Sequence, residues 1–354
     1  MVLLSVHRDA GFLARAALQL APEAVCVTGA GGDANFTPPA GTHTYFGTEG
    51  LEQAFDEVPF DLLVNAVVGA AGLFPTYLAL SRGRAVATAN KESLVIGGSL
   101  LRRTAAAHQA SLLPIDSEHS AIWQCLRAGA RSEVDCVWLT ASGGPFLRRP
   151  PETFDRITPE EALGHPTWKM GNKITVDSAT MMNKGFEVIE AHWLFDLPSD
   201  RIRVVVHPQS IVHSAVAFRD GSVIAHMGVP DMRHPIAYAL LQPDRLAGNV
   251  QPLPLDRLGD LRFEPPDANR FPALELARRA LAMGDSACVA LNAANEVGVA
   301  AFLEGRLKFT RIAQCVAAQL DEVGEEPLAE LHDIYEVDQR FRGAARLWIE
   351  RQNS

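Results

Sequence analysis

The strictest constraint on the fold is an alternation of short apolar runs with amphipathic segments over the first 115 residues. Four apolar runs have the length and composition of buried strands: 2–5, 24–27, 61–66 and 85–88. Four segments carry apolar residues at helical spacing: 11–20, 51–55, 73–80 and 98–108. Strands that alternate with helices in this way predict an α/β fold with a parallel, doubly wound sheet.

Composition narrows the class of protein. With 354 residues the chain is too long for one ordinary core, so we expect two or three domains. A formal charge of -10 leaves no basic excess for a phosphate backbone and argues against a nucleic-acid partner. Five widely spaced cysteines without a Cys-x-x-Cys pair disfavour zinc and disulfides. No apolar run of about 18 residues and no signal-peptide pattern occurs, so we expect a cytoplasmic protein without a membrane partner.

The rest of the chain predicts two further units and a linker. Apolar runs at 134–140, 204–207, 212–218 and 223–227 predict an antiparallel or mixed sheet. Residues 242–266 are rich in Pro, Leu and Asp without periodicity, and the pattern from 271 to the end is helical. We therefore expect an incomplete Rossmann-like nucleotide-binding domain, an α+β catalytic domain, a linker and a C-terminal helical domain: 1–115, 116–241, 242–266 and 267–354.

The opening of the sheet departs from the usual pattern. A dinucleotide-binding sheet starts with a strand, a Gly-x-Gly-x-x-Gly turn and a helix, and this sequence has none of them before residue 2. The run at 2–5 then corresponds to a second strand, and we expect it to lack a neighbour on one side. Gly69 and Gly72 do not replace the missing turn, because a lone Gly-x-x-Gly after a strand is a weak signal. It forms either a tight turn or a backbone contact to a cofactor.

Acidic residues follow the apolar run that ends at residue 115. Asp116 and Glu118 stand at the C-terminal edge of a predicted strand, where open parallel sheets bind their ligands. One interpretation is that Asp116 or Ser117 caps the following helix and Glu118 adds a first-turn charge. The other adds Glu187 to make three oxygen ligands, which without nearby Cys favour a magnesium- or manganese-like cation.

Polar residues between 177 and 190 complete a candidate phosphate site. If a helix begins near Ser178, Asn183, Glu187 and Glu190 share one face, although a solvated face with a Lys184–Glu187 pair has the same pattern. Donors suited to a phosphate monoester are Ser142, His165, Ser178, Asn183 and Lys184. The turn at 142–145 is either an anion nest or a strand exit. Segment 164–171 mixes Gly and Pro with Trp168, which predicts either a mobile lid or a surface loop with a buried Trp.

Several of these segments together resemble 1-deoxy-D-xylulose 5-phosphate reductoisomerases. The resemblance is carried by Asn-Lys-Glu-Ser-Leu-Val at 90–95, Asp-Ser-Glu-His at 116–119, Ser-Gly-Gly-Pro-Phe at 142–146, the stretch 176–185, His-Pro-Gln-Ser at 207–210 with His213, and Leu-Asn-Ala-Ala-Asn-Glu at 291–296. It runs from about residue 2 to near the C-terminus. It implies reductive isomerisation of 1-deoxy-D-xylulose 5-phosphate to 2-C-methyl-D-erythritol 4-phosphate, a step towards isoprenoids, with NADPH and Mg²⁺ or Mn²⁺ (Co²⁺ is an alternative), in a homodimer.

The resemblance also implies roles for individual residues. Asp116, Glu118 and Glu187 would hold the metal. Lys91 and Ser117 would contact substrate oxygens, and Ser142, Ser178, Asn183 and Lys184 would take the phosphate. His165 and Trp168 would belong to the lid, and Glu190 and His213 would be acid/base or supporting groups. The implied cofactor-binding residues are His7, Arg8, Asp9, Asn90, Glu92, Met170 and Gly171.

Two departures from the family pattern concern the cofactor. The family's opening Gly-x-Thr-Gly-x-x-Gly turn is not in this sequence, and Asp9 stands where Asn is usual. From these we expect the chain beginning at Met1 to bind NADPH poorly. Two alternatives therefore stay open: a non-catalytic relative that binds metal and phosphosugar, and a metal-dependent phosphosugar lyase or isomerase without a redox step.

Overall fold

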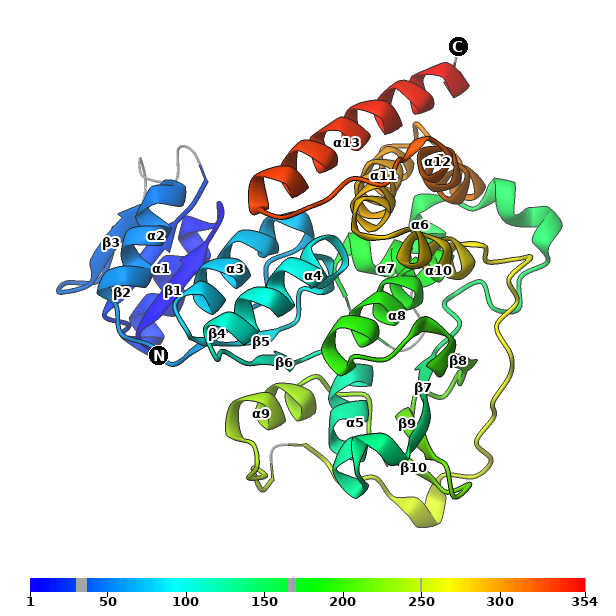
Figure 1. The fold of residues 1–354 in the computed structure, drawn as a ribbon, viewed down its shortest axis with the longest axis horizontal. Coiled ribbons are helices and arrows are strands. Elements are labelled where there is room, and N and C mark those ends of the chain that lie inside the picture. Colours follow the sequence, from blue (N-terminus) through cyan, green and yellow to red (C-terminus); the bar gives the residue numbers. More distant parts are fainter. Residues whose placement is uncertain (30–36, 165–167, 169, 249, 354) are drawn as a thin grey trace.

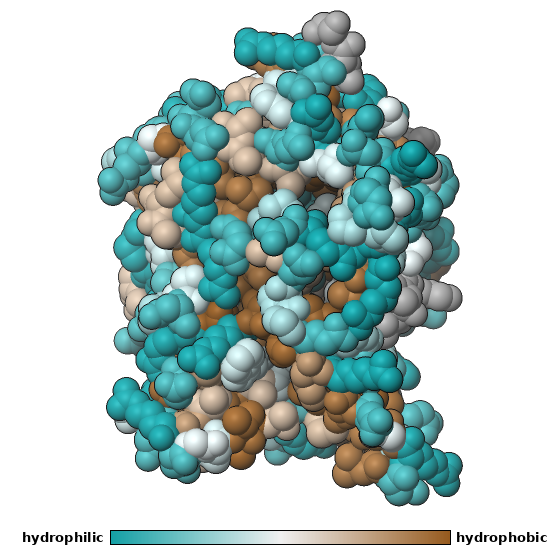
Figure 2. All heavy atoms as spheres, turned by 90° about the vertical axis from the view of Figure 1, so that its right-hand side faces the viewer, coloured by the Kyte–Doolittle hydropathy of each residue, from teal (hydrophilic) through white to brown (hydrophobic). Residues whose placement is uncertain are grey.

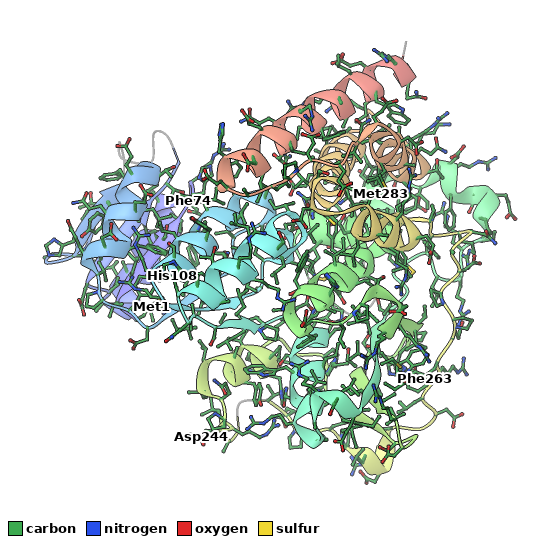
Figure 3. All side chains as sticks on the ribbon, viewed as in Figure 1. Met1, Phe74, His108, Asp244, Phe263 and Met283 are labelled. Carbon is green, nitrogen blue, oxygen red and sulfur yellow. The ribbon has the colours of Figure 1, made fainter. Side chains whose placement is uncertain are left out.

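The computed structural model describes residues 1–354 except 30–36, 165–167, 169, 249 and 354. Figure 1 shows an elongated molecule in which the N-terminal sheets lie at one end and the helical C-terminal region lies above the centre. Met1 and His108 are on the side of the N-terminal sheets, whereas Phe263 is at the opposite end (Figure 3). The pocket described below lies where these regions meet.

The N-terminal region contains two parallel three-stranded sheets. The first consists of β1 (Leu3–Val6), β2 (Ala24–Val27) and β3 (His43–Phe46), and the second of β4 (Leu62–Asn65), β5 (Ala85–Thr88) and β6 (Leu112–Pro114). The helices of this region are α1 (Ala10–Leu20), α2 (Gly47–Glu57), α3 (Leu73–Ser81) and α4 (Lys91–Ala107). This alternation confirms the predicted α/β class.

The two sheets do not join into one. Among the described residues β1 pairs only with β2, as the sequence predicts, and β4 pairs only with β5. Val64 of β4 is 46% exposed, and Val67 and Val68 just beyond it are exposed as well. The segments that follow β5 and β6 contribute residues to the pocket described below, among them Lys91 and Asp116.

A mixed four-stranded sheet forms the middle region of the chain. Its order is β10 (Val223–Met227), β9 (Val212–Phe218), β7 (Val134–Ala141) and β8 (Ile202–Val206). Only β7 and β8 run parallel; the other pairs are antiparallel. The helices of this region are α5 (Ser117–Cys125), α6 (Pro159–Ala162), α7 (Asn172–Thr180), α8 (Met182–Phe195) and α9 (Arg233–Leu241). The sheet confirms the mixed alternative from the sequence.

Four helices close the chain: α10 (Ala273–Met283), α11 (Asp285–Leu303), α12 (Phe309–Glu322) and α13 (Leu331–Asn353). Helix α11 is long and apolar enough to cross a membrane by length and composition, which the sequence analysis did not anticipate. Its 18-residue apolar window is 83% buried inside the protein, however, as in a core helix. It packs against α10, α12, α13 and α4, so it connects the helical region to the N-terminal region.

Several local predictions were wrong. The helix expected to begin near Ser178 begins at Asn172 and is broken at Met181, whose φ is +63°. The helix expected at 98–108, by contrast, is present and ends at Ala107. A further helical segment that begins at Lys91 precedes it and meets it at a kink at Gly97. Asn90 caps this first segment by accepting a hydrogen bond from the Ser93 amide. Strand β3 was not predicted at all. The domain boundaries stay a prediction.

Candidate active site

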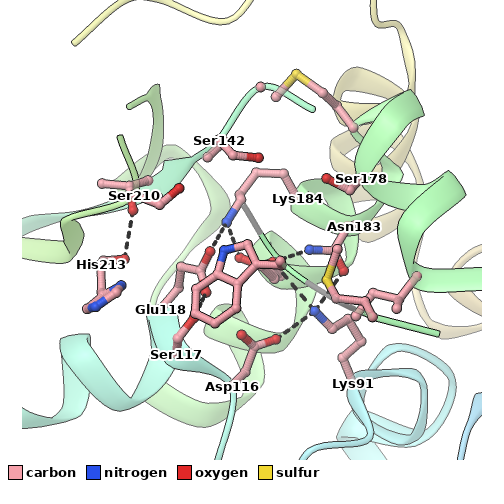
Figure 4. Close-up of a pocket in the computed structure, with 18 of the residues that line it drawn as sticks. Lys91, Asp116, Ser117, Glu118, Ser142, Ser178, Asn183, Lys184, Ser210 and His213 are labelled. Atoms are coloured by element: carbon pink, nitrogen blue, oxygen red, sulfur yellow. Dashed lines mark hydrogen bonds and ion pairs between the residues drawn. The ribbon is translucent and has the colours of Figure 1, made fainter. Parts of the chain in front are cut away.

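Four elements bring polar side chains into one cavity of about 260 Å³ (Figure 4). The loop after β6 and the start of α5 supply Asp116, Ser117 and Glu118, and the start of α4 supplies Lys91. The first two turns of α8 supply Asn183, Lys184 and Glu187. Every residue that the sequence assigned to the metal therefore faces the same cavity.

The three carboxylates converge. Ligand oxygens of Asp116, Glu118 and Glu187 all lie within 4.8 Å of one another, which suits a single hard cation with three protein ligands. Asp116 occupies the N-cap position of α5 but makes no capping hydrogen bond with its side chain. Its carboxylate instead lies 2.6 Å from the Lys91 ammonium. The interpretation of Asp116 as a helix cap is therefore wrong, and the donor set fits a divalent metal.

Two buried lysines face these carboxylates. The Lys91 Nζ lies 3.5 Å from Glu187 Oε1 and donates to Asn183 Oδ1 at 2.8 Å. The Lys184 Nζ lies 2.8 Å from Glu118 Oε1 and also pairs with Glu187. Because Lys184 and Glu187 are almost fully buried, the alternative of a solvated helix face is wrong.

The cavity perturbs the ionisation of its groups. Burial raises the pKa of Glu187 to about 8, and the nearby charge of Glu118 acts in the same direction. Burial also opposes ionisation of Asp116, but the Lys91 ammonium outweighs it and holds the pKa of Asp116 below its usual range. Despite burial, Asp116 and Glu187 raise the pKa of Lys91 well above normal. A carboxylate that is costly to ionise beside two others is a group that gains from a bound cation.

A second set of potential metal ligands shares Asp116 and extends away from the cavity. Asp116, His119 and Glu190 also place ligand atoms within 4.8 Å of one another, but His119 and Glu190 are buried and do not line the cavity. The His119 Nε2 lies 2.9 Å from the Glu187 carbonyl oxygen, so this nitrogen carries the proton and donates. Burial lowers the pKa of His119 to about 4. Glu190, named from the sequence as a catalytic candidate, therefore supports the site from behind.

The cavity is also lined by the hydroxyl groups predicted for a phosphate. Ser142 follows β7 and Ser178 lies on α7, and both line the cavity with Asn183 and Lys184. Gly144 makes this approach possible: its φ is +68°, and an added Cβ would lie 2.7 Å from the Ser178 carbonyl oxygen. The turn at 142–145 thus packs directly on α7, and metal and phosphate donors share one cavity.

Other predicted residues lie at the mouth of the cavity. Trp168, Met170 and His213 line it, whereas His165 lies outside the described residues. The cavity is also lined by Ser210, Ile174 and Met232, which were not predicted from the sequence. Ser210 has a φ of +52°, and its place in the resembling segment 207–210 was the one signal that would have found it.

The predicted cofactor residues occupy separate places. His7, Arg8 and Asp9 follow β1 at the C-terminal edge of the first sheet, and Asp9 caps α1 by accepting from the Phe12 amide at 2.8 Å. Asn90 and Glu92 are buried at the start of α4. Gly171 precedes α7 and does not line the cavity. The structure therefore places 7–9 and 90–92 at the carboxyl edges of the two sheets, Met170 in the cavity and Gly171 at the start of α7, so the predicted cofactor residues do not share one pocket.

Three family models match the chain in sequence. Residues 1–98 match 1-deoxy-D-xylulose 5-phosphate reductoisomerase, and residues 112–195 match the C-terminal domain of the same enzyme. Residues 227–344 match a further DXP reductoisomerase C-terminal domain. The chain belongs to the 1-deoxy-D-xylulose 5-phosphate reductoisomerase family.

Curated reductoisomerases are similar over most of their length. The chain is 48% identical over 355 residues to the enzyme of Paraburkholderia xenovorans (strain LB400), which covers 98% of the chain and 88% of that relative. It is 51% identical over 312 residues to the enzyme of Cupriavidus pinatubonensis, which covers 87% and 79% respectively.

Solved reductoisomerase structures share the fold. A crystal structure of DOX-P reductoisomerase with NADPH, fosmidomycin and magnesium has a TM-score of 0.92 and 40% identity, and covers 100% of the chain and 92% of that protein. The Zymomonas mobilis enzyme with NADPH has a TM-score of 0.90 and 37% identity, with coverages of 99% and 91%. These likenesses confirm the predicted family and favour catalysis over the non-catalytic alternative.

Proposed function

We propose that this protein converts 1-deoxy-D-xylulose 5-phosphate to 2-C-methyl-D-erythritol 4-phosphate, using NADPH and Mg²⁺ or Mn²⁺, in isoprenoid biosynthesis. The observation that carries the proposal is the single cavity that Asp116, Glu118 and Glu187 share with the hydroxyl and ammonium donors predicted for the phosphate. Reductoisomerase relatives at 48% and 51% identity support the same reaction.

The geometry assigns each set of residues in the cavity a task. Asp116, Glu118 and Glu187 would hold the divalent metal, which supplies polarisation of the substrate's carbonyl and adjacent hydroxyl, while NADPH supplies the hydride. Ser142 and Ser178, together with Asn183 and Lys184 beside the carboxylates on α8, bind the phosphate through hydrogen bonds and charge. They fix the carbon chain relative to the carboxylates.

Other residues in the cavity and at its mouth complete the site. The Lys91 ammonium lies 2.6 Å from Asp116 and 3.5 Å from Glu187, and despite burial these charges raise its pKa, so it binds substrate oxygens as a cation. Ser117 donates to Glu118 at 2.5 Å and keeps that carboxylate oriented. Trp168 and Met170 place apolar surface over the cavity and exclude water during reaction.

The direct test is turnover by the purified protein. With 1-deoxy-D-xylulose 5-phosphate and Mn²⁺ present, we expect NADPH oxidation followed by absorbance, and 2-C-methyl-D-erythritol 4-phosphate identified by mass spectrometry. A metal chelator should stop it. Conversion of the phosphosugar without NADPH consumption would instead support the lyase or isomerase alternative, and metal-dependent phosphosugar binding without conversion would support the non-catalytic one.

We also propose a homodimer in the cytoplasm. Figure 2 shows apolar side chains gathered between hydrophilic ones on the face seen at the right of Figure 1. Val223 and Ile224 on edge strand β10 are 57% and 40% exposed, and Phe263 is 50% exposed. All five cysteines are free and buried, which suits a reducing compartment. Light scattering of the purified protein and fractionation of the source cells test the two statements.

A further inference from the structure

The motif at 291–296 has no role in the site described so far. It lies in α11, and its last two residues reach two different parts of the molecule. Asn295 donates to Asp177 Oδ1 of α7 at 2.7 Å. Glu296 accepts a hydrogen bond at 3.1 Å from the backbone amide of Ala70, 226 residues earlier in the chain. Neither residue touches the cavity at the carboxylates.

Glu296 contacts the turn that follows β4. The turn spans residues 66–72 at the carboxyl edge of the second sheet, where open α/β sheets bind nucleotides. Its Gly69 has a φ of +73°, and an added Cβ would lie 2.8 Å from Glu296 Oε1. The positive φ favours glycine at this position, and the Glu296 carboxylate lies close against the backbone there.

Hydrogen bonds hold the buried side of this turn from three directions. The Asn90 amide donates to the carbonyl oxygens of Val67 at 2.7 Å and Gly69 at 2.9 Å. Asn65 donates to the Gly72 carbonyl oxygen at 2.8 Å, and Glu296 accepts from Ala70. The outer side is different, because Val67 and Val68 are 41% and 73% exposed. A backbone fixed from behind, with apolar side chains exposed at a sheet's carboxyl edge, is suited to contact a planar ring.

Arg342 holds the Glu296 carboxylate from the other side. The Arg342 guanidinium of α13 lies 2.5 Å from Glu296 Oε2 and 2.6 Å from Asp338 Oδ2. Asp338 and Arg342 are one turn apart on α13, so the guanidinium is held on its own helix and presented to α11. Helix α13 thus reaches the turn through one intermediate side chain.

We propose that Glu296 is a positioning residue of the NADPH site, which holds the turn at 66–72 in its binding conformation and is itself held by Arg342. This proposal rests on the proposed function, because that function supplies NADPH as the ligand. It gives the C-terminal helical region a role in cofactor affinity, although none of its residues lines the catalytic cavity.

The test measures NADPH binding directly and in turnover for Glu296→Ala, Glu296→Gln and Arg342→Met. We expect Glu296→Ala to weaken NADPH binding and raise its KM on the order of 10- to 100-fold, the effect of losing a hydrogen bond to a charged group. The KM for 1-deoxy-D-xylulose 5-phosphate and the Mn²⁺ affinity should stay unchanged. Glu296→Gln keeps an oxygen that accepts from Ala70, so it should recover most of the loss.

Arg340→Met is the matched control for Arg342→Met. Both arginines lie on α13 and pair with a glutamate, but Arg340 pairs with Glu326 at the surface. We expect Arg342→Met to raise the NADPH KM several-fold and Arg340→Met to leave it unchanged; if Glu296→Ala does not fold, this pair decides. Equal changes in both KM values, an unchanged NADPH affinity, or no NADPH binding by the wild type would each overturn the proposal. Wild-type NADPH binding without turnover would defeat the proposed function alone.

Discussion

Two buried charge clusters lie next to each other in the chain's structure: one includes residues of α7, and the other faces the cavity that Ile174 and Ser178 of α7 help to line. They differ in access rather than in composition. The pocket cluster is Lys91, Asp116, Glu118, Lys184 and Glu187; the α7 cluster is Glu92, Lys173, Asp177 and Asn295. In each, the carboxylates outnumber the ammonium groups by one. The pocket cluster lines the cavity and the α7 cluster does not.

The α7 cluster is closed by the protein itself. Lys173 lies 2.5 Å from Glu92 Oε1 and 2.9 Å from Asp177 Oδ2. The remaining oxygens accept from amides, Glu92 Oε2 from Asn90 at 3.1 Å and Asp177 Oδ1 from Asn295 at 2.7 Å. All four carboxylate oxygens thus have protein partners. Similar buried charges can therefore bind a ligand where a cavity reaches them and stabilise the fold where none does.

The largest effect is expected in the pocket cluster. Glu187→Gln removes one of three anionic ligands and should weaken Mn²⁺ binding by more than the roughly 10- to 100-fold cost of losing an outer partner. Activity should fall on the order of a thousandfold, because several kcal/mol of metal assistance is lost. The fold should persist. Calorimetry with Mn²⁺ measures the affinity, Asp116→Asn repeats the test, and Glu275→Gln on the surface of α10 is the control. Unchanged affinity in both pocket variants would remove the metal site.

Lys173→Met should have the opposite effect, with lower stability and unchanged metal binding. It leaves Glu92 and Asp177 buried without their shared ammonium, which should lower the free energy of unfolding by about 3 kcal/mol. Mn²⁺ affinity of the folded protein should be retained. Denaturant unfolding measures the loss, and Lys308→Met removes a lysine that is 65% exposed as the matched control. If Lys173→Met instead abolished metal binding without loss of stability, the two clusters would not be separate.

Glu92 should contribute less to the stability of the fold than Lys173, and its contribution should depend on pH. Burial alone would raise its pKa, but the Lys173 ammonium outweighs burial and lowers it. A carboxyl whose folded pKa lies below its unfolded value of about 4.3 stabilises the protein above that pH, and this stability is lost as pH falls through the folded pKa. Wild type should therefore exceed Glu92→Gln in melting temperature at pH 7, and the difference should shrink as pH falls below about 4. A constant difference would show that Glu92 acts through shape alone.

The smallest effect concerns the mouth of the pocket. Trp168 lines the cavity and contributes one of five indoles, so a phosphonate substrate mimic should change only part of the emission. The difference between wild type and Trp168→Phe isolates that part. A silent Trp168 would favour the surface-loop interpretation of segment 164–171.

The sequence predicted the features of the fold and the site that are determined by residues close together in the chain. Asp116 and Glu118 follow a strand directly, so their place at a sheet edge was predictable, and the resemblance supplied Glu187. The break at Met181 gave no signal, because a non-glycine residue with positive φ is set by packing. Strand β3 was missed because its four residues follow a loop rich in Gly and Pro and lack clear alternation. Ser210 and Glu296 lie in segments that carry the family resemblance, but their roles could not be predicted because they depend on contacts distant in sequence.

The divided N-terminal sheet has a consequence for cooperativity of unfolding. Leu13, Ala17, Val25 and Val27 form a core separate from the large core that continues through the catalytic sheet and the C-terminal helices. Segments with few apolar contacts to the rest of a protein open at lower free energy than the whole. Helix α1 and the strand surface under it should therefore exchange their amide hydrogens ahead of α8 and α11, and a single melting temperature would describe the catalytic half of the molecule but not this end.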